Sequence, residues 1–320
     1  LLLQFGGDSF AWASLECYAM VAVAIILLAI FVKIEFRAKD PVLNPLLFHN
    51  RTVVAAMVFM AVFGIGMMGA MTYSSYFNIA ILGLTTMQAG EWSLVLVAGM
   101  MITAMSSGAL LNKTGYKFWL IAGPVITFCA LYYMSTIKYG NTIQDMAPGM
   151  FFLGLGLGCM ASVVMVAVQN VSKPEEMGMT TSSVNLMRSI GATSGTAIFA
   201  MVIAGKMNTE IGASQIPLIA PDIYHFIQNT PSYSGTGILD FMSSEVFQAY
   251  AAVNPLGAMA VAQEILKSFA NCIDFAFLVG GLIVLCLVVI GLFIKGNKVV
   301  SRELFSASHK NAAEPVAESE

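Results

Sequence analysis

The sequence predicts an all-α integral membrane protein with seven transmembrane helices. Hydrophobic residues make up 58% of the 320-residue chain and charged residues only 10%, against about 25% charged residues in soluble domains. Between Cys17 and Ile294 the chain repeatedly forms uncharged runs of about 20 residues, the length at which a helix crosses a bilayer core of about 30 Å. A soluble fold of this size could not cover its surface with so few charges.

Seven apolar runs define the predicted helices. In chain order they are Ala13–Val32, Val53–Leu82, Trp92–Leu111, Phe118–Ile137, Pro148–Val168, Gly178–Gly205 and Ala270–Ile294. The second and the sixth are longer than a bilayer requires, which predicts tilt or continuation beyond it. We read 1–33 as an external segment with one helix, 34–52 as a basic connection and 53–294 as a six-helix unit.

The segment 206–267 is predicted as a long external loop. Within it, Asp240–Ala252 and Ala258–Lys267 have the pattern of short amphipathic helices that rest on the outer surface. They form either a lid or a covering, and we favour the covering. The tail 295–320 is polar, and we expect it to be disordered.

Lysine and arginine residues alternate in density from one connection to the next. One set of connections and the tail carry eleven of them, whereas the opposite set carries only Lys138, Lys206 and Lys267. Cytoplasmic segments of membrane proteins are enriched in these residues. The pattern therefore predicts a multi-pass protein of the cell membrane with a cytoplasmic C-terminus. Residues 1–12 resemble the mouth of a preceding helix, so we expect a C-terminal fragment; a complete seven-helix protein is the alternative.

Several classes of function and ligand are not expected. No basic patch interleaves with aromatic residues, which argues against nucleic acid. The three histidines lie in separate segments, and the five cysteines form no CxxC pair, so neither a metal nor a cofactor is predicted. No nucleophile and base meet at one depth, and the chain is therefore not expected to be an enzyme. A lipid bilayer is the certain partner.

Arg188 is the most informative polar residue. It lies roughly 15 Å into the sixth predicted helix, where a guanidinium costs at least about 2.5 kcal/mol unless it faces protein or water. Thr181, Asn185, Arg188, Ala192 and Gly195 recur at helical spacing on one polar or small face. We predict either a residue that lines a substrate cavity or a structural arginine bound to backbone carbonyls. Tyr73, in the polar end of the second helix, is a further candidate for the cavity.

Glycines and carboxylates complete the candidates. Gly64, Gly66 and Gly69 form a literal GxGxxG inside an apolar helix, which indicates close helix packing rather than dinucleotide binding. A proton-driven transporter needs a carboxylate within the membrane. The candidates Glu16, Glu91 and Asp274 all lie near external helix ends, so no coupling carboxylate is evident at the midplane.

Four stretches resemble the fourteen-helix drug:proton antiporters of the major facilitator superfamily. They are Gly6–Trp12, Gln88–Gly90, the cytoplasmic loop motif Gly108–Lys117, and Gln169–Asn170 followed by Gly178, Asn185, Arg188, Gly191 and Gly195. The resemblance implies one linker helix plus the six-helix C-terminal half of the fold, with loop residues Gly108, Asn112, Lys113, Gly115 and Lys117. Asn112 departs from the motif, which usually has an acidic residue there, and this weakens a gating role.

The resemblance implies proton-coupled export of hydrophobic or cationic small molecules by alternating access, together with an N-terminal half. Its cavity residues would be Tyr73, Asn185 and Arg188. A major facilitator carrier of a metabolite or sugar is the alternative. A seven-helix receptor is a more remote one, because no Asp-Arg-Tyr-like triplet ends the third helix.

Overall fold

The computed structural model describes residues 50–172, 176–229 and 238–294, with scattered helical positions between 18 and 34. Most of the predicted helix Ala13–Val32, with Glu16, and the whole tail 295–320 lie outside the described residues. No strand occurs in the described ranges. The predicted all-α class is therefore confirmed for the part of the chain that carries the six-helix unit.

Six of the described helices are long and apolar enough to cross a membrane. They are α3 (Arg51–Tyr76, continued by the π-helix η2, Phe77–Ile81), α4 (Thr86–Thr114), α5 (Tyr116–Met134), α6 (Ile143–Val171), α7 (Met177–Ala213) and α12 (Pro255–Phe293). They correspond in order to the second to seventh predicted helices. Each helix from α3 to α7 is joined to the next by a short connection, so successive helices run in opposite directions. Gly115 lies at one end of the bundle and Lys138 at the other. We call these the Gly115 end and the Lys138 end.

Local sequence sets the helix boundaries. Thr85 and Gln88 form a capping box at the start of α4, with the Gln88 backbone N–H donating to Thr85 Oγ1 at 3.3 Å; such caps satisfy amides that have no partner within the helix. Gly115 alone separates α4 from α5 and has φ of 74°. This left-handed conformation is easy for glycine and costly for other residues, so the chain reverses there in a single step.

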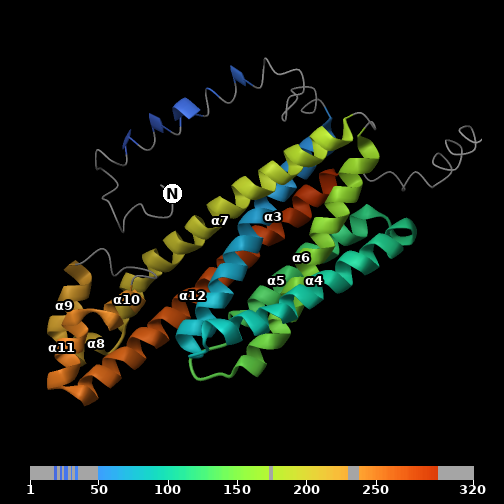
Figure 1. Ribbon diagram of the computed structural model, residues 1–320. Coiled ribbons are helices and arrows are strands. Elements are labelled where there is room, and N and C mark those ends of the chain that lie inside the picture. The colour runs from blue at the N-terminus through green and yellow to red at the C-terminus, as the bar shows by residue number, and fades with distance from the viewer. Residues whose placement is uncertain are drawn as a thin grey trace, which may run out of the picture.

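The α3–α7 seam is a contact between backbones. A Cβ at Gly191 or Gly195 of α7 would meet the carbonyl of Ala61 or Ile65 on α3, and one at Gly64 would meet the carbonyl of Arg188. Small residues allow this approach, which drives helix association where lipid removes the hydrophobic effect. Gly64, Gly66 and Gly69 thus pack helices, as predicted. Figure 1 shows α3 and α7 side by side along the bundle.

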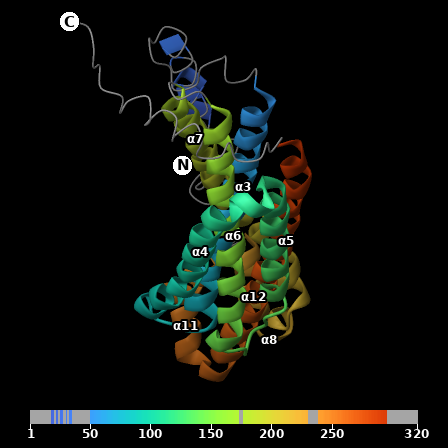
Figure 2. The ribbon, with the colours of Figure 1, turned by 90° about the vertical axis from the view of Figure 1, so that its right-hand side faces the viewer.

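The remaining helices build a second layer around α6. Both α4 and α5 pack on α6, and α12 closes the bundle by contacting α3, α5 and α7. Figure 2 shows α4 and α5 on opposite sides of α6. The α4–α6 contact also uses glycines, because a Cβ at Gly154 would meet the Leu96 carbonyl. The side of α4 away from α6 exposes Met87, Leu94, Met101 and Met105.

The segment 206–267, predicted as a loop with two short helices, is mostly helical. Helix α7 continues to Ala213, and α12 begins at Pro255, so the predicted surface helix Ala258–Lys267 is part of α12. Between them lie α8 (Ile216–Ile219), α9 (Pro221–Asn229), α10 (Ile238–Ser243) and α11 (Glu245–Val253). The single helix predicted over Asp240–Ala252 is divided between α10 and α11, because Ser244 caps the start of α11.

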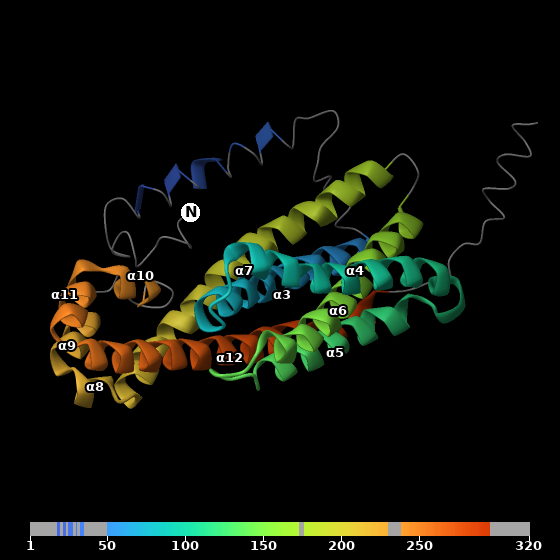
Figure 3. The same ribbon diagram turned by 60° about the horizontal axis from the view of Figure 1, so that its bottom comes forward.

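These four short helices and the adjoining ends of α7 and α12 form what we call the cap, at the Lys138 end (Figures 1 and 3). The error has a simple cause, since Lys206 and Lys267 were taken as the limits of the loop. Charges end a membrane span but not a helix. The two overlong helices carry these charges beyond the apolar bundle, where Lys267 pairs with Glu264 at 3.6 Å.

Candidate functional site

The candidate site is the polar flank of α7, formed by Thr181, Asn185 and Arg188. The three side chains lie at successive turns of the helix, and each is half-buried. Arg188 stands eleven residues after the start of α7, a rise of about 16 Å. It is the only charged residue of α7 before Lys206, so a single positive charge lies deep within this span.

Arg188 has an unmet hydrogen-bonding need. Its backbone carbonyl lies at the α3–α7 seam beside Gly64, which holds the residue in place. Its Nε is buried and has no hydrogen-bond partner among the described residues. A buried donor without a partner is destabilising, and a cation more so. The Nε–H group of Arg188 is therefore left without an acceptor by the described residues.

The neighbouring polar groups bond to their own helix. Asn185 Nδ2 donates to the Thr181 carbonyl at 3.1 Å, and Thr181 Oγ1 donates to the Met177 carbonyl at 2.7 Å. The exposed residues Ser189 and Thr193 repeat the same pattern. Back-bonding of this kind lets a helix carry hydroxyl groups in an apolar setting. The flank thus offers polar oxygen atoms around Arg188.

One member of the predicted face, Gly195, and the further cavity candidate Tyr73 lie elsewhere. Gly195 packs in the α3–α7 seam, on the side of α7 that faces α3. Tyr73 is only 4% exposed and stacks on Phe199 with ring centroids 5.8 Å apart. Its position in the core corrects the expectation that it lines a cavity. The spacing of residues along one helix could not predict that Phe199 of α7 covers the Tyr73 ring.

The predicted cytoplasmic loop is mostly helix. Gly108, Asn112 and Lys113 lie within the last turns of α4. Lys117 is exposed in the first turn of α5. Trp119 Nε1 donates to Thr114 Oγ1 at 2.7 Å, and Asn170 Nδ2 donates to the Tyr116 hydroxyl. These bonds tie α4, α5 and α6 together at the Gly115 end.

The two described carboxylate candidates differ sharply. Glu91 is exposed in the second turn of α4. Asp274 is 8% exposed, and its Oδ1 has no partner among the described residues. It lies in the middle of α12 rather than at a helix end, which corrects the prediction, although it stays near the Lys138 end of the bundle. The polar residues Glu264, Lys267, Asn271 and Asp274, spaced three, four and three apart, were the signal that was missed.

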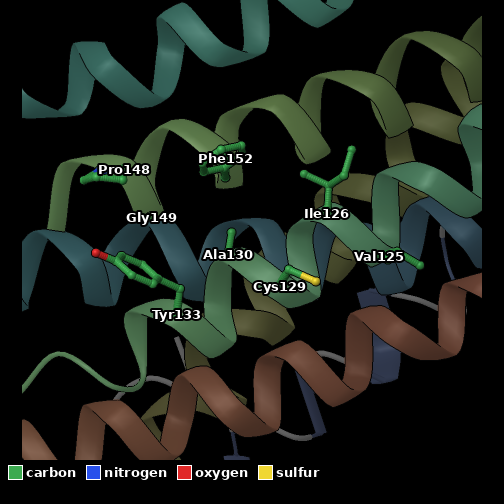
Figure 4. Close-up of a pocket in the computed structure, with 8 residues that line it drawn as sticks. All are labelled: Val125, Ile126, Cys129, Ala130, Tyr133, Pro148, Gly149 and Phe152. Atoms are coloured by element: carbon green, nitrogen blue, oxygen red, sulfur yellow. The ribbon is translucent and has the colours of Figure 1, made fainter. Parts of the chain in front are cut away.

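An apolar hollow of about 460 Å³ lies between α5 and α6. Figure 4 shows Ile126 and Cys129 of α5 and Phe152 of α6 along it, with Tyr133 and Pro148 at one end. The lining offers a polar ligand almost nothing to bind. We therefore place the candidate site on α7 and not in this hollow.

Comparison with known proteins fits this architecture. Residues 1–196 match the pattern of the Major Facilitator Superfamily. The chain belongs to this superfamily. Its members are membrane transporters rather than enzymes, in agreement with the expectation above. This membership also argues against the seven-helix receptor.

Three relatives illustrate the match. The chain is 29% identical to the multidrug transporter protein MdtP of Bacillus subtilis, over 68% of this chain and 40% of that protein. It is 29% identical to an uncharacterized transporter of Mycobacterium tuberculosis, over 66% and 31%. It is 25% identical to a tetracycline resistance determinant of Streptomyces rimosus, over 89% and 84%. The chain spans about two fifths or less of the first two relatives.

Proposed function

We propose that this chain forms the C-terminal part of a secondary active transporter that exports hydrophobic or cationic small molecules. A linker helix precedes six helices that form one wall of a central cavity, and an N-terminal half supplies the other. The two walls expose the cavity to each face in turn, and protons that move inward drive the export. Relatives that bear the names of multidrug and tetracycline resistance proteins support this substrate class.

The observation that carries the proposal is the unsatisfied Arg188. A guanidinium at this depth requires an acceptor, and Nε finds none among the described residues. A carboxylate on the opposite wall would supply it when the cavity is closed on that side. Making and breaking this ion pair would then favour one state of the transporter over the other, so Arg188 contributes to the gate, with Thr181 and Asn185 beside it.

The orientation follows from charge. Arg51 and Lys117 lie at the Gly115 end, and Lys138 lies at the other. Lys206 and Lys267 also lie on the Lys138 side. In the sequence, the lysine- and arginine-rich segments 34–49 and 295–320 adjoin α3 and α12 at the ends of these helices that lie beside Gly115, and this excess favours the cytoplasm. We infer that the C-terminus is cytoplasmic, that the cap is external and that the protein acts in the cell membrane. The residues Gly108, Asn112, Lys113, Gly115 and Lys117 form the cytoplasmic turn.

The test is efflux of a fluorescent cation from cells that express the chain joined to its N-terminal half. Arg188→Ala should lower the efflux rate at least about tenfold, because losing one partner of a buried charge pair costs about 2–5 kcal/mol. Ser189→Ala, which removes an exposed hydroxyl from the next position of α7, is the matched control and should leave the rate unchanged. Rates are normalised to the protein in the membrane, and unchanged efflux by Arg188→Ala would remove this residue from the mechanism.

A carrier of an anionic metabolite is the second candidate. The positive charge of Arg188 would bind a substrate carboxylate directly, and the chain is 25% identical to citrate exporter 1 of Yarrowia lipolytica, over 71% of this chain and 33% of that protein. Efflux of labelled citrate from the same cells distinguishes the two. Citrate efflux that depends on Arg188, without cation efflux, would favour the metabolite carrier.

A further inference from the structure

Two buried polar side chains near the Lys138 end each have an oxygen atom without a donor. Asp274 of α12 is 8% exposed and Asn78 of η2 is fully buried. Neither Asp274 Oδ1 nor Asn78 Oδ1 has a hydrogen-bond partner among the described residues. The Asn78 amide nitrogen makes only a weak contact with the sulfur of Met150 at 3.9 Å. Buried oxygens of this kind are rare and require an explanation.

The helix register places these groups at one level. The Cβ position of Gly281 lies 3.6 Å from Leu131 of the antiparallel helix α5. Asp274 is seven residues before Gly281, and α5 ends at Met134, three residues after Leu131, so Asp274 lies near the level at which α5 ends and the connection with Lys138 begins.

A second contact brings Asn78 to the same level. The Cβ position of Gly66 on α3 meets the side chain of Val284 on α12. Asn78 is twelve residues after Gly66, and Cys272 is twelve residues before Val284. Because α3 and α12 are antiparallel, Asn78 lies level with Cys272, within one turn of Asp274. The two unsatisfied oxygens therefore belong to one buried layer beneath the cap.

A polar cavity leads toward this layer from the cap. It has a volume of about 200 Å³ and is lined by residues that include Glu210 of α7 and Glu264, Lys267 and Asn271 of α12. This volume holds several waters at about 30 Å³ each. Asn271 donates to Glu210 Oε2 at 3.1 Å and precedes Asp274 by one turn on the same face of α12. The lining of the cavity thus ends at Asn271, about 4.5 Å of helix rise before Asp274.

We propose that Asp274 is a proton-binding carboxyl that is loaded through this polar cavity from the Lys138 end. A hydronium ion in the cavity gives up a proton and becomes water, an O–H bond forms at one Asp274 oxygen, and the carboxyl becomes neutral. The proton returns to water when the site opens. The part that this step plays in transport rests on the function proposed above, whereas the proton binding itself does not.

A neutral carboxyl group supplies the hydrogen-bond donor that this buried layer lacks. Protonation removes a buried charge and adds one O–H donor, where the site holds acceptor oxygens without a donor. The charged group nearest to Asp274 is Lys138 after α5, and Cys272, two residues before Asp274 on α12, lies near Lys206 and Glu210 of α7. Lys206 pairs with Glu210 at 3.3 Å and also lies over the Phe275 ring. Two of the three neighbouring charges are therefore already paired with each other, and η2 presents the uncharged Asn78.

The experiment is infrared spectroscopy of the purified 320-residue chain in detergent across a pH series. A carbonyl band of a neutral carboxyl should persist near neutral pH, disappear in Asp274→Asn and shift in frequency in Asp274→Glu. Glu91→Gln removes an exposed carboxylate and should leave this band unchanged. The amide bands report whether each variant keeps its helices. Identical spectra for the parent and a folded Asp274→Asn variant near neutral pH would overturn the proposal.

A second variant separates proton access from folding. Asn271→Leu removes the polar side chain between the cavity and Asp274, so the carboxyl band should remain but respond several-fold more slowly to a pH jump. An unchanged response would overturn the route through the cavity. Proton-driven efflux is then measured for the same variants joined to the N-terminal half. If efflux needs a proton gradient while the Asp274 band is absent, the proposed function stands and the assignment of Asp274 fails; if the band is present without such efflux, the assignment stands.

Discussion

The α3–α7 seam and the α5–α6 hollow are both contacts between apolar helices, yet they are built in opposite ways. At the seam, Gly64, Gly191 and Gly195 bring one backbone against the other. At the hollow, Tyr133, Pro148 and Phe152 border a cavity of about 460 Å³ that opens beside the helices. One contact leaves no room for a methyl group, and the other leaves room for an acyl chain.

The difference follows from the solvent. Apolar side chains gain little by leaving lipid, so helices in a membrane are held together mainly where they pack closely. A hollow at the surface can fill with lipid at little cost, whereas a gap in the seam cannot. The seam also fixes the backbone of Arg188 beside Gly64, so the contact that stabilises α7 also positions the candidate site. The following substitutions test this contrast.

Gly191→Leu should have the largest effect. Its Cβ would meet the backbone carbonyl of Ala61, which cannot rotate away, so α3 and α7 must separate. We expect a loss of about 3 kcal/mol or more, at the upper end of overpacking costs. Thermal unfolding in detergent measures it. Gly205→Leu on the same helix is the matched control, because nothing lies within 4 Å of its Cβ position. Equal melting temperatures for the two variants would refute the seam.

The sequence predicted the six described helices and their glycine contacts because both depend on local spacing and on the need for close packing in lipid. It placed Arg188 correctly within a span for the same reason. It did not predict the start of α12, since Glu264 and Lys267 end the apolar run while the helix continues into the cap. The ends of a membrane span and the ends of its helix need not coincide, and the pattern of apolar residues indicates mainly the ends of the span.

The burial of individual polar residues could not be predicted because it depends on distant partners. Tyr73 is covered by Phe199 of α7, more than a hundred residues away. Asp274 is buried because α12 extends into the cap and because α5 ends at the same level near Lys138. Helical spacing identifies which residues share a face, but not which neighbour covers that face.

Gly115→Ala should have an intermediate effect. It separates the cost of an unfavourable backbone conformation from the cost of a steric clash such as that at Gly191. Nothing lies within 4 Å of the Cβ position of Gly115, but its φ of 74° is unfavourable for alanine. We expect a loss of about 1–3 kcal/mol, because its φ of 74° and ψ of 164° lie in a region that is essentially restricted to glycine. Gly90→Ala in α4 is the control, because it is equally open but helical and should stabilise by up to about 1 kcal/mol. The two variants should therefore shift the melting temperature in opposite directions, and a shift in the same direction would contradict the role of the turn.

Cys129→Trp should have the smallest effect, although it adds the most volume. Cys129 is exposed on the hollow, where a ring would replace lipid rather than protein. We expect a change within about 0.5 kcal/mol, as for other exposed positions. Ala130→Trp, one residue further on, provides the comparison, since Ala130 borders the same hollow but is only 2% exposed. A ring there must enter the α5–α6 contact and should destabilise by several-fold more. If Cys129→Trp were as destabilising as Ala130→Trp, the hollow would be a packed contact. The distinction between the α3–α7 seam and the α5–α6 hollow would then fail.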